Sequence, residues 1–210
     1  MMNELIKRYP RLAPCEKSIS QAIEQISECY KNGGKLLLCG NGGSAADCDH
    51  IVGELMKGFM KKRRLDEKSK AQMKESFSNI DDKILGGLQG GLPAISLPSA
   101  CALNSAFCND EDPELVFAQG VFALGKKNDV LVAISTSGNS CNVVAAAKVA
   151  RAVGITVVGL TGQGGGELAK ISDVCICVPE CETYKVQEMH LPVYHFICAK
   201  VEECFFKIEN

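Results

Sequence analysis

The stretch Gly40–Glu54 combines two kinds of chemistry. Its first part, Gly40–Ser44 (GNGGS), follows a short apolar run, and a glycine-rich loop in that place can bind a phosphate through free backbone N–H groups. Further along, His50 and Glu54 stand four residues apart, so they share one face of the helix expected there. The combination predicts a phosphorylated substrate, with metal or acid–base chemistry near its other end.

The same loop also satisfies the dinucleotide-binding pattern G-x-G-x-x-G/A over Gly40–Ala45. That interpretation requires a second strand ending in an acidic residue about 20 positions further on. The chain reads Met60-Lys61-Lys62 there, and no strand pattern precedes it. We therefore expect a simple phosphate-binding loop rather than a nucleotide site.

A second loop, Ser135–Ser140 (STSGNS), carries four hydroxyl groups in six residues. It lies between a predicted buried strand and the predicted start of a helix, where unpaired N–H groups and the helix dipole attract anions. Ser140 alone could be explained as a helix N-cap, but a cap uses only one hydroxyl. The loop is therefore predicted to bind a phosphate monoester.

Two of the three histidines lie near the C-terminus, within Gln187–His195. Gln187 and His195 are eight residues apart, about 80° around a helix axis, so both can face one cleft. His190 follows the apolar Met189 and is expected to be a core or surface residue, not a ligand. From the residues alone, a metal site built with the earlier His/Glu pair is no better supported than a solvated helix face.

The elements that must position these side chains alternate between strands and helices. Short aliphatic runs predict buried parallel strands, separated by helical segments such as the alanine-rich 142–153. This predicts an α/β fold, a doubly wound parallel sheet, after an N-terminal helical segment over residues 1–33. Both loops follow strands directly, and ligands in such sheets bind outside the carboxyl ends of the strands. The expected strands are Leu36–Cys39, a weaker Ala94–Leu97, Val130–Ile134, Thr156–Leu160 and Val174–Val178.

The composition describes one ordinary domain of 210 residues with a formal charge of −2. No global positive field points to nucleic acid, and no apolar stretch reaches the ~18 residues that a membrane span needs. The twelve cysteines include no CxxC pair, and an aliphatic chain of this size is not a disulfide-stapled secreted scaffold. We expect free thiols, no signal peptide and a cytoplasmic location.

Taken in order, these motifs resemble the sugar isomerase (SIS) family over nearly the whole chain, and within it the enzymes that isomerise phosphorylated heptoses. The resemblance implies a single domain over residues 1–210, with a five-stranded parallel sheet flanked by helices. It implies a homotetramer with active sites at subunit interfaces. It also implies aldose–ketose isomerisation of sedoheptulose 7-phosphate to D-glycero-D-manno-heptose 7-phosphate through an enediol, assisted by a divalent metal.

The family's site residues can be carried over motif by motif. The resemblance implies one zinc ion (Zn²⁺) per active site, with Glu54 also acting as the base and His195 as the acid. The implied zinc ligands are His50, Glu54, Gln187 and His195. The implied substrate-binding residues are Asn41, Gly42, Gly43, Ser44, Glu54, Asn109, Asp110, Ser135, Thr136, Ser137, Ser140 and Gln187.

Three features depart from the family pattern. Residues 61–92 form a charged, glycine-ended segment that we expect to be a helical insertion, either a solvated surface helix or a lid whose basic residues hold the phosphate. Tyr184-Lys185 stands where the family often has other side chains, and Pro192 falls between two implied ligands. Another phosphoketose therefore remains open as the substrate. A non-catalytic SIS regulator or scaffold that binds a sugar phosphate is the alternative function, and retention of all four implied ligands favours the enzyme.

Overall fold

The predicted sheet is present in the structure, a computed structural model that describes residues 2–206. Five parallel strands lie in the order β2-β1-β3-β4-β5. Each strand matches its predicted range to within one residue at either end, so the α/β class and the doubly wound sheet are confirmed. The strands are β1 (Leu36–Cys39), β2 (Ala94–Ser96), β3 (Val130–Ser135), β4 (Thr156–Thr161) and β5 (Val174–Cys177).

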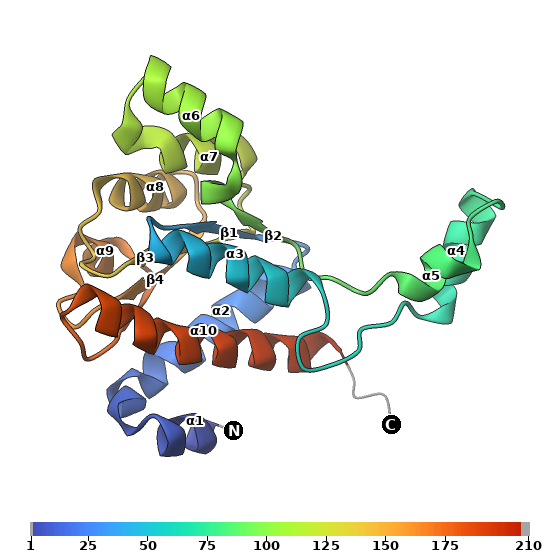
Figure 1. Cartoon of the computed structure of the whole chain (residues 1–210), viewed down its shortest axis with the longest axis horizontal. Helices are drawn as coiled ribbons and strands as arrows, with labels where there is room; N and C mark the ends of the chain where they lie inside the picture. Colours follow the sequence, from blue (N-terminus) through green and yellow to red (C-terminus); the bar gives the residue numbers. More distant parts are fainter. Residues whose placement is uncertain (1, 207–210) are drawn as a thin grey trace.

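Strand β1 is apolar throughout because helices cover both faces of the sheet. Leu36 and Leu38 pack into one core cluster, while Leu37 and Cys39 pack into the other, as the alternation of side chains along a strand requires. The first face carries α1 (Met2–Arg8), α2 (Glu16–Lys31), α3 (Gly43–Met56) and α10 (Thr183–Phe205). The second carries α6 (Cys101–Asp110), α7 (Val116–Leu124), α8 (Cys141–Ala152) and α9 (Gly166–Ile171) (Figure 1). Short 3₁₀ helices span Pro10–Cys15, Leu97–Ser99 and Pro113–Leu115.

The strand order reverses at β1, which lies between β2 and β3. The segments that follow β1 and β3 therefore lead to helices on opposite faces of the sheet. This leaves a crevice between the carboxyl ends of these two neighbouring strands. β1 leads through residues 40–42 into α3, and β3 leads through residues 136–140 into α8. The side-chain amides of Asn41 and Asn142 exchange two hydrogen bonds of 2.8 and 3.0 Å across the crevice. The two predicted loops thus meet at the position where such sheets bind ligands.

Residues 61–92 form an arm that projects from the body of the molecule (Figure 1). It carries α4 (Glu67–Ser76) and α5 (Asp82–Gly87), and an isolated antiparallel bridge between Arg64 and Gln89 joins its two ends. No residue of α4 is buried. One member of the basic run, Arg63, is instead fully buried at the base of the arm, where its Nε donates to Glu202 Oε1 at 2.7 Å. Arg63 is therefore not available to hold a substrate phosphate, as the lid interpretation would require.

Candidate active site

Helices α3 and α10 lie side by side and bring three of the four predicted ligands together. The Gln187 amide packs against Gly43, where an added Cβ atom would lie 2.5 Å from Nε2 and would displace the end of the glutamine side chain. About two turns further along both helices, His195 meets His50. Because the two contacts advance together, the helices run in the same direction. Gln187 and His195 therefore both contact α3, at different points along it.

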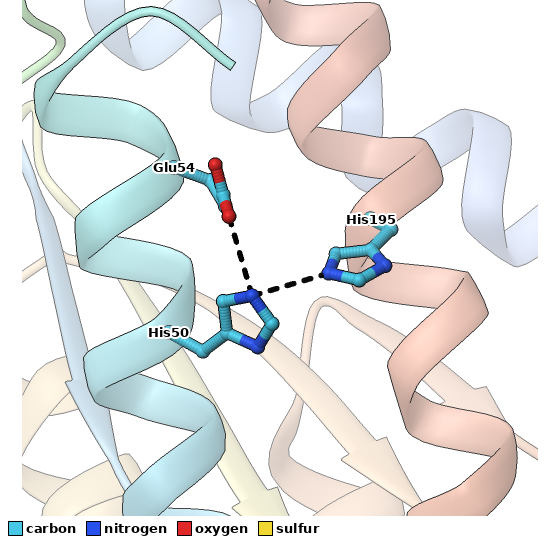
Figure 2. Close-up of side chains that lie close together, drawn as sticks. All are labelled: His50, Glu54 and His195. Carbon is cyan, nitrogen blue, oxygen red and sulfur yellow. Dashed lines mark hydrogen bonds and ion pairs between the residues drawn. The ribbon is translucent and has the colours of Figure 1, made fainter. Parts of the chain in front are cut away.

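Three of the predicted ligands form a compact cluster (Figure 2). Nε2 of His50 lies 3.2 Å from Glu54 Oε1 and 3.3 Å from His195 Nε2. One donor atom from each residue falls within 4.8 Å of the others, and within residues 2–206 this is the only such group of three or more His, Cys, Asp or Glu side chains. Gln187 lies beside Gly43, about two turns of α3 before His50. Its role as a fourth ligand therefore remains a prediction.

The donor set suits zinc. Two imidazole nitrogens and a carboxylate oxygen are common ligands at catalytic zinc sites, with bonds of about 2.0–2.2 Å. Atoms arranged tetrahedrally at that bond length lie roughly 3.3–3.6 Å from one another. The two short separations around His50 Nε2 are close to that spacing. The residues present therefore fit a divalent metal.

Electrostatics favour the ligand forms of these side chains. Burial, and then the neighbouring His50, lower the pKa of His195, while the Glu54 charge opposes them. His195 is thus neutral at neutral pH, the form in which imidazole binds metals. The other carboxylate oxygen of Glu54, Oε2, lies 3.2 Å from Lys57 Nζ.

The hydroxyl-rich loop has the features of an anion site. Ser140 occupies the N-cap position of α8, but its side chain makes no capping hydrogen bond. Its Oγ instead lies 3.0 Å from Ser135 Oγ, which leaves first-turn N–H groups of α8 open to a ligand. Gly138 adopts φ +68°, and a Cβ there would lie 2.0 Å from the Gly165 carbonyl oxygen, so this tight turn requires glycine. Ser137 is exposed at the tip of the loop, and Thr136 is half-buried.

Some of the remaining residues that were predicted to contact the substrate line the crevice, and others lie outside it. Asn41 and Gly42 line a cavity of about 340 Å³ together with Cys108 at the end of α6. Ser44 is buried. Asn109 and Asp110 are exposed at the C-terminus of α6, joined by a 2.8 Å hydrogen bond, and do not line that cavity. Their contact with a sugar remains a prediction.

Comparison with known proteins identifies the family. The profile of the SIS domain matches residues 3–85 and 91–162, more than half of the chain. The chain belongs to the SIS family. The phosphoheptose isomerase of Rhodospirillum rubrum is 37% identical over 195 residues, which cover 93% of this chain and 90% of that protein. The phosphoheptose isomerase of a Roseiflexus species is 40% identical over 88% of this chain and 80% of that protein. A solved phosphoheptose isomerase from Neisseria gonorrhoeae superposes with a TM-score of 0.75 at 33% identity, covering 96% and 94% of the two chains.

Within this SIS domain, sequence reasoning missed two residues beside the histidine cluster: Tyr194, which contacts His50, and Asp47, which contacts Tyr194. Tyr194 lies beside His195 in the sequence and was not singled out there. Its hydroxyl donates to Asp47 Oδ1 at 3.1 Å and lies 3.0 Å from His50 Nδ1. The only signal was positional, since Asp47 stands one helical turn before His50. No pattern in the sequence pairs residues that are 147 positions apart.

Proposed function

We propose that this SIS protein is a phosphosugar aldose–ketose isomerase that converts sedoheptulose 7-phosphate to D-glycero-D-manno-heptose 7-phosphate. The observation that carries the proposal is the cluster of His50, Glu54 and His195, in a chain whose relatives at 37–40% identity are phosphoheptose isomerases. The SIS fold supports the proposal together with the hydroxyl-rich loop and the cluster of implied ligands, which a non-catalytic SIS protein would not need.

The phosphate would bind to the hydroxyl-rich loop and the N-terminus of α8. Ser135, Thr136, Ser137 and Ser140 would supply hydroxyl groups, and the helix N-terminus supplies N–H groups and a positive dipole. The sugar would then extend past Asn41 and Gly43 along α3 toward His50. Gly43 and His50 are seven residues apart, about 10 Å along the helix axis, a distance that several carbons of a sugar chain can span.

The reaction moves one proton between C1 and C2. Glu54 would remove a proton from C1 of the ketose and return it to C2, while His195 would donate a proton to O2 and accept one from O1. The intermediate is an enediol, and each positioned acid or base typically contributes about 10²–10⁴-fold in rate. Glu54 has two carboxylate oxygens, of which Oε1 faces His50 and Oε2 faces Lys57. One oxygen can therefore take the proton while the other remains with the ligand cluster.

A zinc ion is the proposed cofactor. His50, Glu54 and His195 would hold it, with Gln187 as the proposed fourth ligand. When bound, the ion would supply a positive charge that polarises the sugar carbonyl and stabilises the negative charge of the enediolate. Glutamine is a less common zinc ligand than histidine or cysteine, so we expect moderate affinity.

We further propose a homotetramer in which active sites lie at subunit interfaces. Large apolar side chains that are exposed in the single chain support association, above all Phe122 on α7, Phe77 on the arm and Met60 just before the arm. The arm belongs to the same proposal, since it presents Phe77.

The cytoplasm is the proposed compartment. All twelve cysteines are free thiols in the structure, as expected where disulfides do not persist. Among residues 2–206, no helix combines the length and the apolar character needed to cross a bilayer.

The substrate is tested with a panel of sugars. Purified protein should isomerise sedoheptulose 7-phosphate, should leave unphosphorylated sedoheptulose essentially untouched, and should turn over fructose 6-phosphate far more slowly. A preference for another phosphoketose would keep the reaction and change the substrate. Binding of sugar phosphates without turnover of any of them would favour the non-catalytic regulator or scaffold.

A further inference from the structure

The hydroxyl of Tyr194 joins two residues of α3. Tyr194 is buried on α10, and its hydroxyl donates to Asp47 Oδ1 at 3.1 Å while lying 3.0 Å from His50 Nδ1. Asp47 and His50 stand three residues apart, so they share a face of α3, and the phenol reaches both at once. The His50 and Tyr194 rings meet edge to face, with their centroids 5.5 Å apart.

The number of protons in this chain of contacts fixes the roles of its members. A phenol has one hydrogen to donate, and an ionised carboxylate can only accept. The Tyr194 hydroxyl donates to Asp47 Oδ1, which leaves its oxygen free to accept a hydrogen bond from His50 when Nδ1 carries the proton. With Nδ1 protonated, a neutral His50 carries its lone pair on Nε2. That lone pair points at Glu54 Oε1 and His195 Nε2, the position where the proposed metal would lie.

We propose that Tyr194 is a positioning residue of the metal site, which holds the His50 ring in the orientation and tautomer that present Nε2 to the metal, with Asp47 anchoring the hydroxyl. This inference rests on the proposed zinc site. Ligating histidines generally donate their second N–H to a carboxylate, a carbonyl or water. Here a tyrosine is inserted between the histidine and the carboxylate, and α10 supplies both this support and the ligand His195 from consecutive positions.

The second carboxylate oxygen of Asp47 strengthens the assignment. Asp47 Oδ2 is buried and has no hydrogen-bond partner among the described residues. Burying this oxygen without a partner costs desolvation free energy, which an apolar side chain at the same position would avoid. Packing alone therefore does not explain an aspartate here. Its one side-chain hydrogen bond, to the Tyr194 hydroxyl, instead links it to His50.

Zinc affinity of the sugar-free protein tests the inference, measured by competition with a chromophoric chelator. Tyr194→Phe removes only the hydroxyl, and we expect its Kd for Zn²⁺ to rise by about 10- to 100-fold, the usual effect of losing a partner of a ligating histidine. Tyr30→Phe is the matched control. It deletes the hydroxyl of a second buried tyrosine, which donates to the Pro93 carbonyl at 3.2 Å, away from the cluster. Its Kd should stay within about two-fold of the original protein. Equal Kd values in the two variants would overturn the inference.

Asp47→Asn provides an independent variant should Tyr194→Phe fail to fold. The amide keeps the shape of the carboxylate but can donate a hydrogen bond, which frees the phenol hydrogen to turn toward Nδ1 and so favours the wrong tautomer of His50. We expect a several-fold rise in the Kd for zinc, and an unchanged Kd would contradict the relay. Because no sugar is present, the result does not depend on the substrate. An unaltered chain that binds no zinc would overturn the inference, while turnover of sedoheptulose 7-phosphate would still decide the isomerase function.

Discussion

His50 and His195 meet nitrogen to nitrogen, with their Nε2 atoms 3.3 Å apart, although 145 residues separate them in the chain. Helix α3 begins directly after the first strand of the sheet, and α10 is the last helix of the chain. The site therefore exists only when the C-terminal helix is docked along α3. Glu54, on the same face of α3 as His50, completes the cluster (Figure 2).

Glu54→Gln should reduce kcat by about 10²–10⁴-fold even at saturating zinc, because the amide cannot take a proton from carbon. Binding of the substrate phosphate and the fold should be retained, as measured by equilibrium binding of the substrate and by circular dichroism. The exposed Glu24 on α2 offers a matched control, and Glu24→Gln should leave kcat unchanged. A Glu54→Gln protein with undiminished kcat would remove this residue from the mechanism.

Ser137→Ala should raise KM roughly ten-fold while zinc content stays the same, because the change removes one hydrogen bond to a charged phosphate. Steady-state kinetics and metal analysis of the same preparation measure both quantities. Ser76→Ala, at the exposed end of α4, deletes a hydroxyl far from the loop and should change neither. Parallel losses of zinc and of substrate affinity in Ser137→Ala would indicate that the loop is structural.

Much of this arrangement could be predicted because it depends on local pattern. The strands were predicted to within a residue, since runs such as Leu36–Cys39 are buried on both faces and read as continuous apolar stretches. The positions of the two loops could be predicted because each loop directly follows a predicted strand. Helical spacing allowed Gln187 and His195 to face one cleft, and in the structure both contact α3. Spacing could not predict how far along α3 each of these residues makes its contact. In the structure Gln187 contacts Gly43, and only His195 contacts His50.

The unpredicted contacts all depend on tertiary packing. Arg63 belongs to a basic run that reads as a solvated surface, and its burial is decided by Glu202, 139 residues later. Nothing in the sequence pairs the Tyr194 hydroxyl with Asp47, which accepts its hydrogen bond in the structure. In both cases a polar group can be buried because a residue distant in the sequence hydrogen-bonds to it. A single sequence does not show which distant residues form such pairs.

Arg63→Met should destabilise the protein by about 3–5 kcal/mol, because it leaves Glu202 buried without its ion-pair partner. The same change removes hydrogen bonds from the guanidinium to the carbonyl groups of Glu54 and Leu55, at the end of α3. Urea unfolding at neutral pH measures the loss. Arg11→Met breaks the more exposed ion pair with Glu180 and should cost at most about 1 kcal/mol. Similar losses in the two variants would contradict the structural role assigned to Arg63.

His190 should make stability depend on pH. It is fully buried on α10, and neither ring nitrogen has a hydrogen-bond partner among the described residues, so it is a core residue but not a satisfied one. Burial lowers the pKa of His190 from 6.5 to about 4, and the nearby Thr161 backbone offsets only part of this effect. Between these two values the unfolded chain binds a proton that the folded protein does not, so stability falls as pH drops.

The expected loss from His190 is about 2 kcal/mol between pH 7 and pH 5. His190→Leu removes the titrating group, so its unfolding free energy should fall by that much less over the same interval. Urea unfolding of both proteins at the two pH values measures this difference in unfolding free energy. The contributions of the other titrating groups are the same in both proteins and cancel. Identical pH dependence in both proteins would show that His190 is not the buried neutral group described above.

The most direct test of the account is the rate at which purified protein isomerises sedoheptulose 7-phosphate before chelation, after chelation and after zinc is restored. We predict turnover that is lost on chelation and recovered with stoichiometric Zn²⁺, because the proposed metal site of His50, Glu54 and His195 would lie beside the reacting carbons. Undiminished turnover by fully metal-free protein would contradict the metal site. No turnover by zinc-loaded protein would contradict the assigned reaction.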